Sequence, residues 1–178
     1  MWPQFRKILY ATNLGPESPY VFRYALSIAQ QYNAEIIILH VLEPLNETVK
    51  GMVEFFITDE QFSQHREKAR TYHMERLRKR LAAFCDQETC KLAADVPDPV
   101  KQILVEEGPP AELILSRAKE NNADLIIMGT HRKAREGGSR LLGSTARTVV
   151  NSAKIPVLTI YTPKDKFEDL ESEEVTGQ

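Results

Sequence analysis

Residues 124–129 have the sequence DLIIMG, an apolar run that begins at an acid and ends at a glycine. A short run without alternating polar positions is typical of a strand buried on both faces, as in a parallel sheet. Four further segments fit a buried strand, at residues 7–12, 35–41, 100–106 and 156–161. We therefore predict five strands, and the segments between them decide how the strands are connected.

Helical patterns fill most of these connections. Apolar residues at three- and four-residue spacing predict helices over residues 17–32, 62–84, 110–118 and 144–153. Ser18-Pro19 suits a helix start, because proline fits the first turn. In the longest helix the predicted apolar face consists of Phe62, Ala69, Tyr72, Leu77, Leu81 and Phe84. Strands that alternate with helices predict an α/β fold, an open doubly wound parallel sheet with helices on both faces.

The length and composition indicate one domain with a charged end. The chain has 178 residues, of which 42% are hydrophobic and 27% are charged, close to the averages of globular domains. Residues 164–178 carry six acids, two bases and few large apolar side chains. We predict one α/β domain over residues 1–163, followed by an acidic, disordered tail.

The charge pattern argues against a nucleic-acid-binding or membrane protein. The net charge is −2, and the seven Lys and Arg between Arg66 and Arg80 fit a solvated helix face. No apolar run approaches the roughly 20 residues that span a bilayer, and the first residues lack the pattern of a signal peptide. Cys85 and Cys90 fit incidental thiols of a reducing compartment, so we expect a cytoplasmic protein. The four histidines lack metal-ligand spacing, so we predict no protein-bound metal.

The loop at residues 130–142 is the segment that carries chemistry. It contains His131, Arg132 and three further Lys or Arg against one acid, and it leads into Gly143-Ser144-Thr145. A helix that begins here offers unpaired N–H groups and the positive end of its dipole to an anion. The local pattern fits a phosphate site and, equally well, an ordinary glycine turn with a serine cap. In sheets of this type ligands bind beyond the carboxyl ends of the strands, which is where this loop begins.

Several of these segments together resemble the universal stress protein family. The similarity is carried by residues 124–131 (DLIIMGTH), 141–146 (LLGSTA) and 156–158 (PVL). Residues 7–13 (KILYATN), Glu17-Ser18, residues 39–41 (LHV) and residues 107–111 (EGPPA) are similar as well, and the resemblance spans residues 6–162. It implies a sheet of order 3-2-1-4-5, of the adenine-nucleotide alpha-hydrolase-like type, and a homodimer formed through the last strand, Val157 to Tyr161.

The resemblance also implies the place of a ligand. The first and fourth strands would flank a crevice that holds ATP or another adenine nucleotide, with Mg²⁺ present only together with the nucleotide. Val41 matches the position whose backbone contacts adenine. The expected binding residues are Ala11, Thr12, Asn13, Val41, Met128, Gly129, His131, Arg132, Gly143, Ser144 and Thr145.

The glycine motif departs from that of the family's ATP-binding branch. Gly129 matches its first glycine, but Arg132 stands at the second, and the segment of residues 133–142 before Gly143 is one residue longer. Asn13 stands where this branch usually carries an aspartate near the ribose. Losing the charge-assisted hydrogen bond of a carboxylate weakens binding by about 1–2 kcal/mol. The family also has a branch that does not bind ATP.

Three functions therefore stay open. The first is a dimeric regulatory protein of the stress response that binds a nucleotide and acts on an unidentified protein partner. The second is a nucleotide-free interaction module that uses its sheet edge and the aperiodic connection at residues 43–59. The third is a slow phosphohydrolase, which is disfavoured because the sequence lacks a P-loop lysine motif and an identifiable base. We expect that the protein is not an enzyme.

Overall fold

The computed structural model describes residues 2–43, 60–90, 97–130 and 142–161, with the backbone alone for residues 60–67, 69 and 70. The predicted acidic tail, most of the connection at residues 43–59, and the side chains of Phe62 and Ala69 lie outside the described part of the chain. The division into one domain and a tail stays a prediction.

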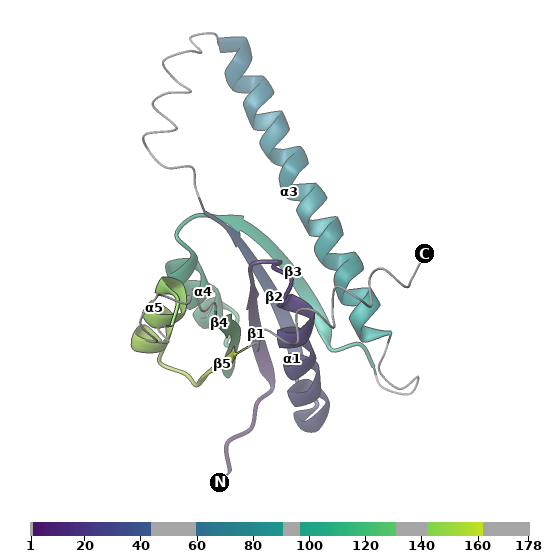
Figure 1. The fold of residues 1–178 in the computed structure, drawn as a ribbon, viewed down its shortest axis with the longest axis vertical. Coiled ribbons are helices and arrows are strands. Elements are labelled where there is room, and N and C mark those ends of the chain that lie inside the picture. Colours follow the sequence, from purple (N-terminus) through teal and green to yellow (C-terminus); the bar gives the residue numbers. More distant parts are fainter. Residues whose placement is uncertain (1, 44–59, 91–96, 131–141, 162–178) are drawn as a thin grey trace, which may run out of the picture.

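A five-stranded parallel sheet forms the centre of the described residues (Figure 1). Its strands are β1 (Lys7–Thr12), β2 (Glu35–Leu42), β3 (Val100–Glu107), β4 (Leu125–Thr130) and β5 (Val157–Tyr161). Their order across the sheet is β3-β2-β1-β4-β5, which confirms the predicted order. β1 lies in the middle, with Ala11 opposite Leu39 of β2 on one side and Met128 of β4 on the other.

In the described part of the chain two pairs of helices cover the sheet, one pair on each face (Figure 1). On one face lie α1 (Ser18–Tyr32) and α3 (Glu60–Thr89), and on the other lie α4 (Pro110–Glu120) and α5 (Ser144–Ser152). The four predicted helices are present, and α1 carries its proline in the first turn as expected. The α/β, doubly wound fold class is therefore confirmed.

Alternate residues of β1 explain why both faces are covered. Ile8 and Tyr10 join the core beneath α1 and α3, whereas Leu9 and Ala11 join the core beneath α4 and α5. All four are buried, and the Tyr10 ring stacks on Phe22 of α1 with ring centroids 5.1 Å apart. Burying a side chain the size of leucine stabilises a fold by about 1.5–3 kcal/mol. A strand that is apolar on both sides gains this stabilisation fully only between two layers of helices.

The amino-terminal part of α3 departs from the predicted apolar face. Leu81 is fully buried, and Leu77 and Phe84 pack half-buried against the core, but Tyr72 is 70% exposed. A helix of 30 residues is roughly 45 Å long, and α3 extends past the sheet that it covers (Figure 1). The prediction that Tyr72 belongs to the buried face is wrong, because the helix is longer than the surface available to it.

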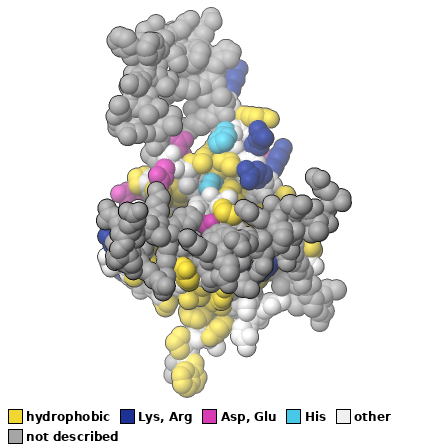
Figure 2. All heavy atoms as spheres, in the orientation of Figure 1, with side chains coloured by type: hydrophobic (Ala, Val, Ile, Leu, Met, Phe, Trp, Pro, Cys, Tyr) yellow, Lys and Arg dark blue, Asp and Glu magenta, His cyan; other side chains and the backbone are white. Residues whose placement is uncertain are grey.

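The described basic side chains of α3 face solvent, as predicted for this helix face. Lys and Arg side chains gather over this helix in the space-filling view (Figure 2). Those that the structure describes are all exposed, namely Lys68, Arg76, Arg78, Lys79 and Arg80. An ion pair joins this helix to α1, because Arg23 Nε lies 2.8 Å from Oε2 of the buried Glu88.

The two cysteines lie in different surroundings and are both free thiols. Cys85 belongs to the core beneath α1 and α3, and burial raises the pKa of its thiol to about 12. It therefore stays protonated and unreactive at neutral pH. Cys90 is exposed at the end of α3. These surroundings are consistent with the incidental role expected for both thiols.

Asp124 ties the start of β1 to the start of β4. Its Oδ2 atom accepts hydrogen bonds from the backbone N–H groups of Arg6 at 2.8 Å and Lys7 at 3.0 Å. The Asp124 N–H in turn donates to the Lys7 carbonyl oxygen at 2.8 Å. These bonds fix the relative position of two neighbouring strands, which gives Asp124 a structural role.

Replacing Asp124 with alanine removes the acceptor of two backbone N–H groups. Hydrogen bonds to a charged group stabilise by about 1.5–3 kcal/mol, and these are partly exposed, so we expect Asp124→Ala to lower the free energy of unfolding by about 1–3 kcal/mol. Asp124→Asn keeps one carbonyl acceptor and should have a smaller effect. Urea denaturation followed by circular dichroism measures both values. Equal losses in the two variants, or no loss in either, would contradict this role.

Candidate functional site

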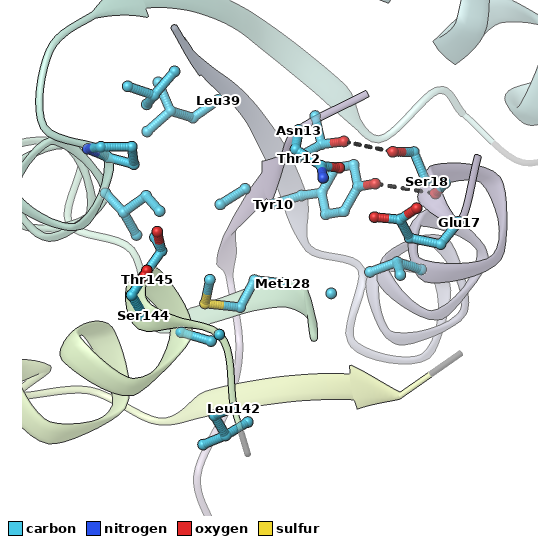
Figure 3. A pocket seen from close by; sticks show the side chains of 18 of the residues that line it. Tyr10, Thr12, Asn13, Glu17, Ser18, Leu39, Met128, Leu142, Ser144 and Thr145 are labelled. Atoms are coloured by element: carbon cyan, nitrogen blue, oxygen red, sulfur yellow. Dashed lines mark hydrogen bonds between the residues drawn. The ribbon is translucent and has the colours of Figure 1, made fainter. Parts of the chain in front are cut away.

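A cavity of about 690 Å³ opens at the carboxyl ends of β1, β2 and β4 (Figure 3). Its walls also include residues at the starts of α1, α4 and α5. Since α1 lies on one face of the sheet and α4 and α5 on the other, the cavity lies where the chain leaves neighbouring strands toward opposite faces. Ligands of doubly wound folds bind at such points.

Nine of the eleven predicted binding residues line this cavity. They are Ala11, Thr12, Asn13, Val41, Met128, Gly129, Gly143, Ser144 and Thr145. The other two, His131 and Arg132, lie outside the described residues. The fold thus brings together residues from three strands and one helix start, whereas their contact with a ligand stays a prediction.

The loop after β1 is held in place by its own side chains. Asn13 Oδ1 accepts a hydrogen bond from the Gly15 N–H at 3.0 Å, and Thr12 Oγ1 accepts one from the Leu14 N–H at 3.1 Å. The hydroxyls of Thr12 and Ser18 share a hydrogen bond of 2.9 Å (Figure 3). These contacts support the left-handed conformation of Leu14, whose φ is 57°. The Asn13 carbonyl therefore serves the turn at the rim of the cavity.

α5 begins at the cavity without a side-chain cap. Its capping residue is Gly143, and no side chain among the described residues caps the first turn. Ser144 is exposed and Thr145 is half-buried, and both border the cavity. The turn with a serine cap, one of the two alternatives for this segment, is therefore not formed. The first N–H groups of a helix without such a cap can donate to an anion.

The wall between the loop after β1 and the start of α5 is apolar. Leu39 and Val41 come from β2, Met128 comes from β4, and Pro110 and Ile114 come from α4. Such a surface suits a flat, apolar part of a ligand, whereas a charged group would lose its hydration there. The cavity thus joins an apolar wall to a helix start.

Glu17 is the buried acid on the β1 side of the cavity. It is 5% exposed and directly precedes α1, whose dipole favours a negative charge at this end. The neighbouring Tyr10 donates its hydroxyl to the Ser18 carbonyl oxygen at 3.0 Å (Figure 3). Burial raises the pKa of Tyr10, so its phenol stays neutral at pH 7. This side of the cavity therefore presents a carboxylate beside neutral hydroxyl groups.

Gly129 lets α1 approach β4 closely. A Cβ atom at this position would lie 3.2 Å from Cγ2 of Val21 in α1. Since carbon atoms pack best at about 3.5–4.0 Å, a larger residue would push the helix away from the sheet. Gly129 therefore has a packing role in addition to the one that the resemblance implies.

The cavity is also lined by ten residues that the sequence did not identify as site residues. They are Tyr10, Glu17, Ser18, Val21, Leu39, Glu43, Pro110, Ile114, Leu142 and Ala146. Their position in the chain could have identified them, because most of them lie near the end of a strand or in the first turns of the following helix. In doubly wound folds these positions face the ligand crevice.

The described residues hold no group of three His, Cys, Asp or Glu side chains that is placed to bind a metal ion. His40, buried in β2, has its Nδ1 atom 2.8 Å from the Thr12 carbonyl oxygen. A carbonyl oxygen only accepts, so Nδ1 carries the proton and the imidazole ties β2 to the end of β1. In the same part of the chain, no helix is long and apolar enough to cross a membrane.

Comparison with known proteins gives one consistent family. The model of the universal stress protein family matches residues 4–160. Universal stress protein A of Yersinia pestis is 24% identical over 162 residues, which cover 91% of this chain and 95% of the relative. The family match therefore includes the strands and helices described above, apart from Tyr161 at the end of β5.

Solved structures agree with this result. Universal stress protein UspA of Lactobacillus plantarum has a TM-score of 0.64 at 18% identity, covering 89% of this chain and 99% of that chain. A universal stress protein in complex with cAMP has a TM-score of 0.57 at 21% identity, covering 90% of this chain and 100% of that chain. These similarities show the adenine-nucleotide alpha-hydrolase-like fold. Because the family model spans most of the sequence, the chain belongs to the universal stress protein family.

Proposed function

We propose that this protein is a regulator in the stress response that binds an adenine nucleotide in the cavity between the ends of β1 and β4. The observation that carries the proposal is the presence of three chemically different walls around one cavity. The start of α5 suits an anion, the apolar wall suits a ring, and the β1 side suits hydroxyl groups. The cavity volume of about 690 Å³ lies within the range of about 300–1,000 Å³ that is usual for small-ligand sites.

A nucleoside phosphate carries these three kinds of group on one molecule. Its base would lie against Leu39, Val41 and Ile114, and its phosphate would lie at Ser144 and Thr145. A universal stress protein of the same fold was solved in complex with cAMP, which supports adenine nucleotides as the class of ligand. Any Mg²⁺ would arrive with the phosphates.

Charge favours the start of α5 as the phosphate end. Among the described residues three helices begin at the cavity, and α1 is preceded by Glu17 while α4 carries Glu112 in its first turn. α5 has no acid in its first turn. An anionic ligand meets the positive end of the α5 dipole without an opposing carboxylate on that helix.

The proposed role is binding and not catalysis. No Lys, Arg, His or Cys is found among the described residues that line the cavity. Phosphoryl transfer depends on cationic groups that neutralise the charge of the transferred phosphate. The described part of the cavity therefore favours nucleotide binding over phosphoryl transfer. We propose that the bound nucleotide alters contacts with an unidentified protein partner and that the protein acts in the cytoplasm.

Calorimetric titration with ATP, AMP and cAMP tests nucleotide binding. We expect saturable heat with at least one of the three, because the apolar wall suits the base and the start of α5 suits the phosphate. A rise in melting temperature should accompany the heat. Neither heat nor a thermal shift at millimolar nucleotide would exclude this function and leave the nucleotide-free interaction module.

Ser144→Asp separates the anion site from the stability of the fold. A carboxylate in the first turn of a helix stabilises it by about 0.3–1 kcal/mol, so the melting temperature without ligand should hold or rise. The same charge repels a phosphate, so the affinity for nucleotide should fall by about tenfold or more, which corresponds to about 1.4 kcal/mol.

Thr148→Asp is the matched control for this variant. Thr148 is an exposed residue of α5 that lies one turn further on and does not line the cavity. Thr148→Asp adds the same charge to α5, yet this variant should leave the nucleotide affinity nearly unchanged. An equal loss of affinity in both variants would point to a general charge effect and remove Ser144 from the phosphate site.

We also propose that β5 forms a homodimer interface. β5 is an edge strand, and its residues Val157, Leu158 and Thr159 are half-buried in the single chain. An edge strand presents unpaired N–H and C=O groups, and an apolar one is usually covered. A second copy of the same strand covers both edges at once in a two-fold arrangement.

Light scattering tests the dimer. At micromolar concentration we expect twice the mass of the chain, because an apolar strand edge gains by pairing. Tyr161→Lys places a charge at the exposed end of β5 and should shift the equilibrium toward monomer. If the unaltered protein has the mass of one chain at this concentration, the proposed interface is wrong.

A further inference from the structure

α3 carries a row of basic residues, with one tyrosine among them, on the side that faces away from the core. We name this row the basic ridge, and it consists of Lys68, Tyr72, Arg76, Lys79 and Arg80. These positions recur at three- or four-residue spacing, so they share one side of the helix. The opposite side packs on the core through Leu77 and Leu81. All five ridge side chains are exposed, and Lys and Arg side chains gather over this helix in Figure 2.

The cations of the basic ridge have no acidic partner within the described part of the chain. Elsewhere on this helix face-to-face pairing does occur, since the buried Glu88 forms an ion pair with Arg23 of α1. None of the four ridge cations forms an ion pair or a hydrogen bond with a side chain that the structure describes. Glu75 is the one acid in the sequence of residues 68–80. Like charges at this spacing repel one another, so an anion placed along the ridge would be stabilising.

Residues 168–174 of the same chain have the complementary composition. Their sequence is EDLESEE, with five acids and no base, and Phe167 directly precedes them. Leu170 lies among the acids. In the basic ridge, Tyr72 is 70% exposed and stands between cations. The acidic segment and the ridge therefore match in charge, and each of them also carries an apolar or aromatic side chain.

The chain is long enough to bring the two segments together. β5 ends at Tyr161 and runs parallel to the other strands, and α3 extends past the carboxyl ends of these strands (Figure 1). α3 packs on β3, the opposite edge strand, which lies four strand spacings from β5, or about 19 Å. Residues 162–174 can span up to about 43 Å when extended. The acids can therefore reach the ridge from the end of β5.

We propose that residues 168–174 bind the basic ridge of α3 in the same chain. Their carboxylates lie against the four ridge cations, and Leu170 lies against the ring of Tyr72. A tether of this length gives an effective concentration of about 1 mM, so a dissociation constant of about 0.1 mM is enough for about 90% occupancy. The contact depends on charge and requires no helix or strand in the acidic segment. It is independent of nucleotide binding.

The test follows the backbone amide signals of residues 168–174 in ¹H–¹⁵N spectra of the full chain. In the unaltered protein, raising NaCl from 0.1 M to 1 M shortens the Debye length from about 10 Å to about 3 Å, so these signals should shift as the contact is released. Arg76→Glu/Lys79→Glu reverses two ridge charges. In this variant the signals should already lie near their high-salt positions at 0.1 M, and their response to salt should fall about threefold or more.

Lys119→Glu/Lys154→Glu is the matched control. It changes the net charge by the same amount at two exposed residues, of which Lys119 lies in α4 on the other face of the sheet and Lys154 precedes β5. The signals of residues 168–174 should keep their full response to salt in this variant. Arg76→Gln/Lys79→Gln replaces the charge-reversal variant if that protein fails to fold, and it should also lower the response.

Three outcomes would overturn the proposal. In the first, the signals are the same in the unaltered protein and the ridge variant, or they change equally in the control. In the second, they move with protein concentration, which would assign the ridge to the acidic segment of another copy. In the third, a single-stranded DNA oligonucleotide binds the unaltered protein in a salt-sensitive way and leaves these signals in place, which would assign the ridge to nucleic acid.

Discussion

Burial of β1 on both faces is the constraint on which the rest of the structure depends. Ile8 and Tyr10 need cover on one side of the sheet, and Leu9 and Ala11 need it on the other. A chain whose strands run parallel must cross over between them, and right-handed crossovers carry helices to the faces. The helix after β1 covers one face, and the helices after β3 and β4 cover the other.

The cavity follows from that arrangement before any functional side chain is considered. β1 and β4 are neighbours, and the chain leaves them toward opposite faces. At such a point the described helices diverge from the space between the carboxyl ends of the two strands, so a crevice forms there. Packing then refines it, since Gly129 lets α1 lie close to β4. The position of the site is thus a consequence of topology, while its chemistry comes from the residues at helix starts.

Local sequence patterns were sufficient to predict the helices and strands, but not to predict which strands pair in the sheet. Apolar runs and helical spacing predicted the strands and helices, because both depend on residues close in sequence. The strand order came from the family resemblance, since parallel pairing joins distant residues such as Ile8 and Leu125. Tyr72 was misplaced because helix spacing contains no information on where the sheet beneath the helix ends.

As with the fold, the parts of the site that depend on local sequence features were predictable. Strand ends and helix starts are local features, so nine of the predicted residues lie at the cavity. The carboxylate of Glu17 was not predictable, because the family resemblance places an acid at residue 13, where this chain has Asn13. The turn through Leu14, with φ of 57°, brings the chain back so that Glu17 lines the same wall. An acid four positions along the chain is near in space only because of that turn.

The helix starts also explain how one cavity can hold an acid and still attract an anion. Each helix start attracts negative charge, and the chain itself supplies that charge beside α1 through Glu17 and in α4 through Glu112. The capping residue before α5 is Gly143, which has no side chain to cap the helix, and α5 has no acid in its first turn. The electrostatic asymmetry therefore lies along the cavity, from a helix start that follows an acid at α1 to one without an acid in its first turn at α5. A ligand with an anion at one end and hydroxyl groups further along matches this asymmetry in one orientation, because the reverse orientation brings two negative charges together.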